Sequence, residues 1–290
     1  MSATVLFDAP GPKARLRNRV CGVAGTLVLL ALVGFAVYRL AAKGQFDGAM
    51  WDIFNYAGVR NSIVQGLLST LQAFAMAGVL SLVLAVLLAV ARLSDHRAVS
   101  LAATGVIELF RAVPLLITIY VLWVAAFTSQ PLWAVVFGLT LYNGAVQAEV
   151  LRAGILAVPK GQSEAAYALG MSKPQVMATV LIPQAVRAML PTIVSQLVVT
   201  LKDTSLGFVI TYEELLYAGR QMANTILVGG ENPYVPVVLV FGAIYVAMCL
   251  ALSALAHWIE RRGRRAKTGI AVADAESATP DPGAVGGRAG

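Results

Sequence analysis

The sequence predicts an all-α protein whose helices cross a membrane six times. Of its 290 residues, 58% are hydrophobic and only 13% are charged, whereas a soluble domain carries about 25% charged residues. The mean hydropathy is +0.75, and several uncharged runs reach the length of a spanning helix, which is about 20 mainly apolar residues. Lipid is therefore the expected surrounding of most of the chain.

The spans follow from apolar runs that no charge interrupts. They lie at 20–38, 61–91, the two halves of 112–148, 187–210 and 234–259. The stretch 112–148 is too long for one helix, and Ser129, Gln130 and Pro131 predict a tight turn inside it. No convincing internal repeat is present, which counts against a secondary transporter built from inverted repeats.

The basic residues predict the orientation of the spans. Cytoplasmic loops collect Lys and Arg, and one side of the predicted topology holds nearly all of them. The loops of the other side contain only Arg39, Lys43, Arg60 and Arg220. Both termini and the loop between the fourth and fifth spans are therefore expected in the cytoplasm. The first eight residues and the tail after residue 268, rich in Ala, Gly, Pro and Asp, are expected to be disordered.

Composition also excludes several classes of function. The net charge of +7 follows from topology, since the basic residues flank apolar spans and form no patch with interleaved aromatics; we expect no nucleic-acid partner. Cys21 and Cys249 lie inside apolar spans, and we interpret them as small hydrophobic residues and not as a disulfide or metal-binding pair. With His96 and His257 as the only histidines, no metal site is expected. A phosphate loop is missing, so any ATP must be bound by a partner, and we expect no enzyme.

The loop between the fourth and fifth spans carries the most informative pattern. Residues 162–169 favour a helix, with Ser163 as a possible N-cap and Glu164 near the positive end of the helix dipole. Ala165, Ala166 and Ala168 would leave a low surface that another protein can approach. The same pattern also fits an ordinary loop helix that packs on its own protein.

Gly170 is expected to end this helix or to take a left-handed turn. Pro174 stands where a second helix can begin, and Pro183 is expected to stop or kink it. One face of that second helix would carry Val176, Met177, Val180 and Leu181.

This loop resembles the "EAA loop" of ATP-binding-cassette (ABC) importer permeases. The pattern of that family is Glu-Ala-Ala, three residues, Gly, nine residues, Ile, any residue, and Leu-Pro. Glu164, Ala165, Ala166 and Gly170 match it, and the segment 180–183 ends it with Val and Ile in place of the usual Ile and Leu.

The resemblance extends over residues 61–259. The segments 107–116, 148–155 and 201–206 are similar to the polar amino-acid branch of the family, the importers of histidine, glutamine, glutamate and arginine. Ala112 and Val113 stand where this branch usually has Gly-Thr. The extra first span and residues 5–12 look similar to actinobacterial glutamate permease subunits.

The resemblance implies a type I ABC importer permease in a bacterial plasma membrane. Its domains would be a cytoplasmic tail (1–19), an additional first transmembrane helix (20–42), the permease domain (61–259) with its coupling loop (157–186), and a basic, then disordered, tail (260–290). The ATPase-coupling residues would be Glu164, Ala165, Ala166, Gly170, Ser172 and Pro183.

The resemblance also implies three partners. They are a cytoplasmic ATPase dimer that binds ATP and Mg, a second, homologous permease that forms a heterodimer with this chain, and an external amino-acid-binding protein. The substrate would be a polar amino acid, glutamate before others. Whether a specific midmembrane site exists, or only a passage, stays open.

Polar groups inside spans are functional candidates by default. Lys202 and Asp203 are adjacent in the fifth span, either as a structural ion pair with other helices or as a gate. Asn143 and Gln147 share a helix face. The candidate path or gate residues are Thr70, Gln72, Asn143, Gln147, Glu149, Lys202, Asp203, Thr204 and Ser205.

Other polar residues have a structural explanation. Glu149 with Arg152, and Glu108 with Arg111, are spaced for ion pairs three residues apart on one helix. Gly66 and Gly78 read as close-packing positions. The acidic residues on the external side either meet a binding protein or are solvated loop charges; they are Glu213, Glu214 and Glu231, beside Tyr212.

The main alternative to the importer is a secondary amino-acid carrier or channel. It would use Lys202 and Asp203 as an ion-coupled site and would need no ATPase. Transport driven by an ion gradient alone would distinguish it.

Overall fold

The computed structural model describes the backbone of residues 11–277 and the side chains of residues 11–255 and Trp258. Over this range the chain is almost entirely helical, and its only strand-like pairing is an isolated bridge between Val228 and Glu231. The chain divides into two compact units: residues 11–60 with Gln221–Val240, and Asn61–Arg220 with residues 241–277. The all-α class predicted from composition is confirmed.

The first unit contains the N-terminal span. Helix α1 (Pro12–Ala42) is followed by the short helix α2 (Gly48–Trp51) and a 3-10 turn (Asp52–Asn55). The buried side chain of Gln45 holds this segment to the loop before the last span. Its Nε2 donates to the carbonyl oxygen of Asn232 (2.8 Å), and its Oε1 accepts from the N–H of Val235 (3.2 Å).

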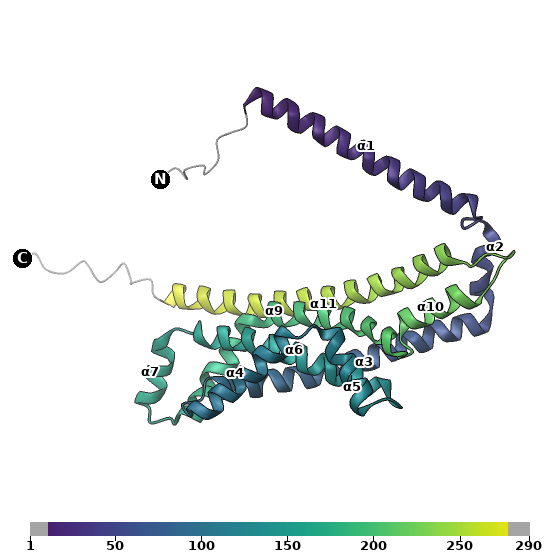
Figure 1. Cartoon of the computed structure of the whole chain (residues 1–290). Helices are drawn as coiled ribbons and strands as arrows, with labels where there is room; N and C mark the ends of the chain where they lie inside the picture. Colours follow the sequence, from purple (N-terminus) through teal and green to yellow (C-terminus); the bar gives the residue numbers. More distant parts are fainter. Residues whose placement is uncertain (1–10, 278–290) are drawn as a thin grey trace, which may run out of the picture. The chain divides into compact units, whose positions relative to one another are not determined.

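The second unit is a bundle of helices labelled in Figure 1. The helices that lie in it or run into it are α3 (Ala57–Arg92), α4 (Arg97–Ala112), α5 (Leu115–Ala126), α6 (Pro131–Leu156), α7 (Lys160–Ala168), α8 (Lys173–Gln175), α9 (Ile182–Asp203), α10 (Leu215–Thr225) and α11 (Tyr234–Ser277). The predicted break before Pro131 is confirmed, since α5 ends at Ala126 and α6 begins at Pro131.

The third predicted span is wrong in detail. Within residues 11–277, five helices are long and apolar enough to cross a membrane, and a sixth crossing exists only if α4 and α5, bent by 101°, are taken as one span. The bend lies at Val113, which is extended (φ −81°, ψ 128°). Pro114 causes it, because a proline ring disfavours the helical conformation of the preceding residue. If the bent pair is one span, that crossing begins at Arg97, well before residue 112.

The fifth span is one long helical run from Lys173 to Ile210. Pro183 does not stop it: a π-helical segment (Val176–Leu181) precedes the proline, and α9 continues directly from Ile182. Proline lacks the N–H of a regular helix turn, and its ring collides with the carbonyl four residues earlier. A wider π turn is a common way for a helix to accommodate such a position.

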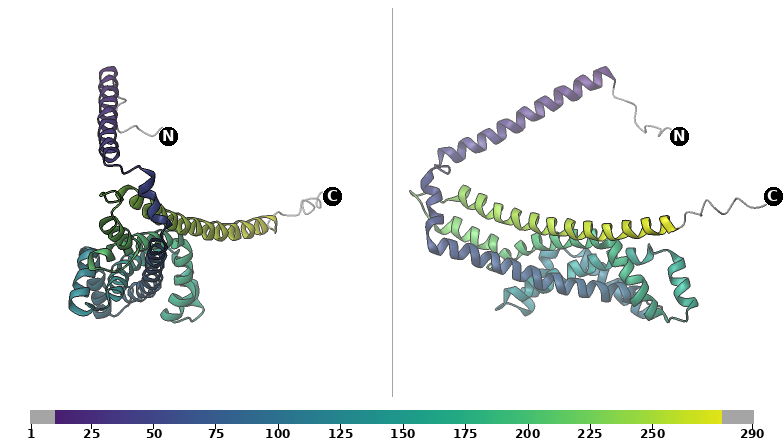
Figure 2. Two further views of the ribbon diagram at one scale, coloured as in Figure 1. Left: turned by 90° about the vertical axis from the view of Figure 1, so that its right-hand side faces the viewer. Right: turned by 180° about the vertical axis from the view of Figure 1, so that it is seen from behind.

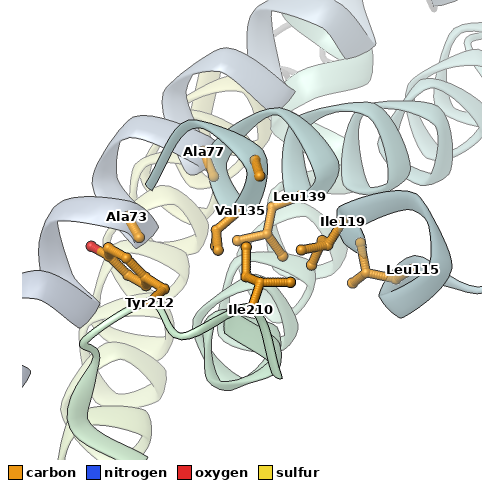
Figure 3. Close-up of a cluster of buried hydrophobic side chains, with 9 residues drawn as sticks. Ala73, Ala77, Leu115, Ile119, Val135, Leu139, Ile210 and Tyr212 are labelled. Atoms are coloured by element: carbon orange, nitrogen blue, oxygen red, sulfur yellow. The ribbon is translucent and has the colours of Figure 1, made fainter. Parts of the chain in front are cut away.

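Helix α3 packs through a row of small residues. Ala73, Ala77, Ser81, Ala85 and Ala89 recur every four residues and are all buried. Small residues at this spacing let helix backbones approach closely in a membrane, where tight packing replaces the hydrophobic effect. One end of the row packs in the cluster of Figure 3, and the other packs against α4, α6 and α9.

In Figure 3 the side chains from α5, α6 and the end of the long run point toward one another over α3. This cluster comprises Ala73, Ala77, Leu115, Ile119, Ala134, Val135, Leu139, Ile210 and Tyr212. Gly66 lies at a close contact, as predicted: a Cβ there would lie 3.0 Å from the Cα of Leu215. Gly78 is buried, but a Cβ there would make an ordinary contact of 3.6 Å with Leu197.

The chain ends differ from expectation where they are described. Helix α1 begins at Pro12, and α11 continues to Ser277, so residues 269–277, predicted as disordered, are helical. The alanines at 271, 273 and 275 favour this continuation, since alanine is the strongest helix former. The first eight residues and the tail from residue 278 lie outside the described residues.

Candidate functional site

Helix α7 stands apart as a short helix at one end of the second unit, the end where α3 finishes and α4 starts (Figure 1; Figure 2, right). It begins at Lys160, two residues before the predicted start at 162, and its N-cap is Pro159 and not Ser163. Pro159 is extended, and its carbonyl oxygen accepts the N–H of Gln162 (3.0 Å). The hydroxyl of Ser163 lies inside the first turn and donates to the carbonyl of Lys160 (2.8 Å).

Backbone hydrogen bonds cap the C-terminal end of α7, and Gly170 ends the helix as predicted. Gly170 is left-handed (φ +78°). Its N–H donates to the carbonyl of Tyr167 (2.9 Å), and the N–H of Met171 donates to the carbonyl of Ala166 (3.2 Å). These two bonds form a Schellman motif, which satisfies carbonyl groups left free at a helix end.

The surface of α7 is only partly the low alanine face expected. Glu164, Ala165 and Ala168 are exposed, but Ala166 is buried, so it belongs to the inner face of the helix. Two large side chains extend from the outer end of α7: Leu169 is 83% exposed and Tyr167 is 46% exposed. The helix thus presents a carboxylate, a small-residue surface and two apolar side chains to its surroundings.

Polar side chains hold α7 to α9 and close the start of α8. Gln184 Nε2 donates to Gln162 Oε1 (3.3 Å). Ser172 caps α8, with its N–H and its hydroxyl both donating to Gln175 Oε1 (2.8 and 2.9 Å). Ser172 therefore starts the long run that contains Pro183. An ion pair between Lys173 and Asp95 links this start to the α3–α4 connection.

The two predicted ion pairs are present, and a residue from a third helix joins them. Glu149 contacts Arg152 (3.1 Å) on α6, and Glu108 contacts Arg111 (3.6 Å) on α4. Arg92, the last residue of α3, contacts both carboxylates, pairing with Glu149 and lying 3.8 Å from Glu108. We call the resulting row the ion chain; its members in order are Arg152, Glu149, Arg92, Glu108 and Arg111.

The predicted shared face of Asn143 and Gln147 is confirmed, and both side chains are fully buried. Asn143 Oδ1 accepts from Gln196 Nε2 of α9 (2.8 Å), and Gln147 Nε2 lies 3.4 Å from Ser81 Oγ of α3. These contacts bond α6 to its two neighbours in the bundle interior.

The remaining candidate path residues lie in two other places. Thr70 is buried, and its hydroxyl accepts the N–H of Leu215 (3.1 Å), whereas Gln72 is exposed on the surface of α3.

The Lys202–Ser205 segment lies where α9 gives way to a 3-10 turn (Thr204–Ile210). The hydroxyl of Tyr245 reaches it from α11, at 2.9 Å from Thr204 Oγ1, and Ser205 Oγ donates to the carbonyl of Lys202 (2.8 Å). Lys202 is exposed and Asp203 is half-buried, and neither forms an ion pair with a side chain that the structure describes.

The acidic residues between the last two spans divide into two kinds. Glu213 and Glu231 are exposed, and Glu231 pairs with Lys43 (3.9 Å). Glu214, however, is fully buried, so the expectation of a solvated or partner-facing charge is wrong there. Its two carboxylate oxygens accept the N–H groups of Leu216 (2.8 Å) and Tyr217 (2.7 Å), which caps α10. Beside it, the Tyr212 hydroxyl donates to the carbonyl of Ser69 (2.8 Å).

Burial raises the pKa of Glu214 from 4.5 to about 7, against the opposing effect of the two N–H donors. Because the folded-state pKa lies above the unfolded one, the protonated form contributes stability that is complete below about pH 4.5 and is lost as the pH rises through about 7. The difference corresponds to roughly 3 kcal/mol.

We therefore expect the purified wild-type protein to denature at a lower temperature at about pH 8.5 than at about pH 5. Glu214→Gln keeps an acceptor for the N–H groups and cannot ionise, so this variant should lose most of the difference. Glu213→Gln, at the exposed neighbouring position, is the control and should keep it. An equal pH dependence in all three proteins would contradict the assignment.

Comparison with known proteins places the chain in a family. The model of the family described as "Binding-protein-dependent transport system inner membrane component" matches residues 81–265. The glutamate transport system permease protein GluD of Corynebacterium glutamicum is 39% identical over 241 residues, which cover 80% of this chain and 86% of that protein. The glutamate/aspartate import permease protein GltK of Escherichia coli is 31% identical over 212 residues, covering 69% and 92%.

Solved structures agree with the fold. A crystal structure described as an amino acid ABC transporter with histidines superposes with a TM-score of 0.61 at 30% identity, covering 70% of this chain and 94% of that one. Other relatives are named for arginine (28% identical) and for L-cystine (32% identical), so the matches share amino acids as a class of substrate.

Proposed function

We propose that this chain, which belongs to the family of binding-protein-dependent transport system inner membrane components, is the glutamate-importing permease subunit of an ATP-driven transporter. At the coarser level, it is a bacterial membrane protein and an ABC importer permease for amino acids. Its relatives are transporter subunits and not enzymes. Glutamate is proposed because the relative at 39% identity is named for it, whereas the relatives named for arginine and L-cystine are 28% and 32% identical.

The geometry of α7 carries the proposal of ATP coupling. A preformed helix bounded by Pro159 and Gly170, with exposed Tyr167 and Leu169, has the size and surface to enter a groove on a soluble protein. Helix-in-groove recognition uses such apolar side chains on one side of a helix. The partner would be a cytoplasmic ATPase dimer that binds ATP and Mg, since the chain has no phosphate loop of its own.

Motion of α7 would reach the membrane through the chain itself. Helix α6 ends at Leu156, shortly before α7 starts, and the Lys173–Ile210 run begins shortly after α7 ends. The burial of Ala166 and the hydrogen bond between Gln162 and Gln184 hold α7 to its surroundings. Displacing α7 would therefore shift α6 and α9 as rigid bodies, which is how ATP-driven closure would alternate access to the path.

The translocation path is proposed at the segment Lys202–Ser205. Here α9 gives way to a tighter 3-10 turn, and the exposed Lys202 and the half-buried Asp203 are neighbours in sequence. A zwitterionic substrate offers the complementary pair of charges. The other polar groups, Asn143 and Gln147 among them, bond helices to one another inside the bundle and are proposed as structural.

The complex would also contain a homologous second permease and an external amino-acid-binding protein that delivers the substrate. The family description names dependence on a binding protein. The heterodimer, the cytoplasmic position of both termini and a selective midmembrane site are proposals at the same level. No observation favours the ion-coupled carrier over this assembly.

The test is substrate-stimulated ATP hydrolysis by the complex copurified with this chain and reconstituted in liposomes. The external binding protein is supplied with glutamate, glutamine, aspartate or arginine in turn. We expect glutamate to stimulate hydrolysis several-fold and the others to have little effect. Stimulation by another amino acid alone would overturn the glutamate assignment, and transport on an ion gradient without any copurified ATPase would overturn ATP coupling.

A further inference from the structure

Arg92 has no role in the function described so far, yet it joins three helices. Its guanidinium contacts Glu149 of α6 and Glu108 of α4, and its carbonyl oxygen accepts the hydroxyl of Ser100 (2.8 Å) from the first turn of α4. Its side chain is 19% exposed, and that of Glu149 is 18% exposed. The centre of the ion chain is thus largely removed from solvent, where charge pairs interact more strongly than at the surface.

The connectivity of the chain makes this contact important. In the chain, α7 follows α6 directly and precedes the Lys173–Ile210 run, whereas α3 and α4 are separated from α7 by α5 and α6. Any displacement of α7 therefore reaches α3 and α4 through side-chain contacts. Glu149 lies within the last two turns of α6, so the Arg92–Glu149 pair joins α3 to the part of α6 nearest α7.

We propose that Arg92 is a positioning residue for transport: through Glu149 and Glu108 it makes the α3–α4 pair move with α6 when the ATPase displaces α7. This rests on the proposed function, because it assumes that α7 receives the motion. Loss of the pair would leave only the apolar contacts of α3 and α4 with α6 and the Lys173–Asp95 pair to transmit the motion, so ATP would still be hydrolysed while the path opened less completely. The expected signature is uncoupling, in which less substrate is imported for each ATP hydrolysed.

The test measures import per ATP hydrolysed in liposomes that contain the complete complex. We expect Arg92→Met to lower this ratio by about tenfold, within the range typical of coupling between two sites, while ATP hydrolysis stays within about twofold of wild type. The control is Arg97→Met: Arg97 is an exposed arginine five residues away, and the structure describes no ion pair for it. That variant should keep the wild-type ratio.

A charge reversal separates coupling from a merely structural role. Arg92→Glu and Glu149→Arg should each lower the ratio. The double variant should recover part of it, because the central pair is restored with opposite polarity while its two ends then face Glu108 and Arg152 with like charges. If Arg92→Met does not reach the membrane, the ratio is measured on Arg92→Lys, whose single ammonium cannot hold both carboxylates as a guanidinium does.

The outcomes separate this inference from the proposed function. If the wild-type complex imports amino acid but an Arg92 variant present in normal amount keeps the wild-type ratio, the role of Arg92 is wrong and the importer stands. If the wild-type complex shows no ATP-dependent import, the proposed function fails, and this inference fails with it.

Discussion

Gly170→Asp should abolish amino-acid uptake while leaving the protein in the membrane. Gly170 adopts a left-handed backbone (φ +78°), which costs about 1–2 kcal/mol for a residue with a Cβ. The new carboxylate would also stand at the negative end of the α7 dipole, a further cost of about 0.3–1 kcal/mol. We expect uptake to fall by about 100-fold, the upper end of typical coupling between sites.

The amount of protein should be unchanged because the space around Gly170 is open, with no atom within 4 Å of the position that a Cβ would take. Uptake of radiolabelled glutamate and the amount of protein in membranes are measured together. Gly229→Asp is the matched control, since Gly229 is also left-handed (φ +61°) and open but lies in the loop before the last span. Normal uptake by a well-expressed Gly170→Asp variant would refute the coupling role of α7.

Gly138→Val should destabilise the bundle more than any surface change. A Cβ at Gly138 would lie 2.5 Å from Cγ1 and 3.2 Å from Cα of Ile119, so α5 could not remain against α6. Figure 3 shows Ile119 in the cluster with Leu115 and Leu139. Overpacking of this kind costs about 1–3 kcal/mol, which lowers the denaturation temperature by roughly 2–12 °C.

The measurement is the thermal denaturation midpoint of the purified protein in detergent, with the amount in membranes as a second readout. Gly105→Val is the control: it makes the same change inside a helix, α4, at a position with open space around it. The control therefore carries the same loss of helix propensity without the collision. Equal midpoints for the two variants would show that α5 does not pack as the structure has it.

Local rules account for the part of this fold that was predictable. The break before Pro131 and the left-handed Gly170 depend on the conformations allowed to a few neighbouring residues, and both are confirmed. The pairs Glu149–Arg152 and Glu108–Arg111 depend only on helix spacing, and they are present too.

Some errors could have been avoided from the sequence itself. Pro114 restricts Val113 by the same rule that applies at any proline, so the bend between α4 and α5 had a visible signal. The row of small residues on α3, from Ala73 to Ala89, is also readable at four-residue intervals. Pro183 is different, because a proline that stops a helix and one that follows a π turn have the same local sequence.

Contacts between distant segments set the remaining limits. Arg92 joins the ion chain because α3 ends beside α6 and α4, and its own neighbours in sequence do not indicate this. From the sequence, Glu214 resembles a charged loop residue. It is buried because its neighbours Tyr212 and Leu215 are bonded to Ser69 and Thr70 of α3, which are distant in sequence. The polar contacts of Asn143 and Gln147 likewise need partners on other helices.

The closed ends of α7 have a consequence for how the transporter assembles. A nine-residue helix is marginal in water by itself, but here its first turn starts on Pro159 and its last carbonyls are bonded within the chain. In the proposed assembly, the ATPase that binds α7 would not have to fold it. The conformational entropy of α7 is lost when the permease folds and not when the ATPase binds. The contacts between α7 and the ATPase would therefore contribute more of their free energy to the affinity, as for any preorganised ligand.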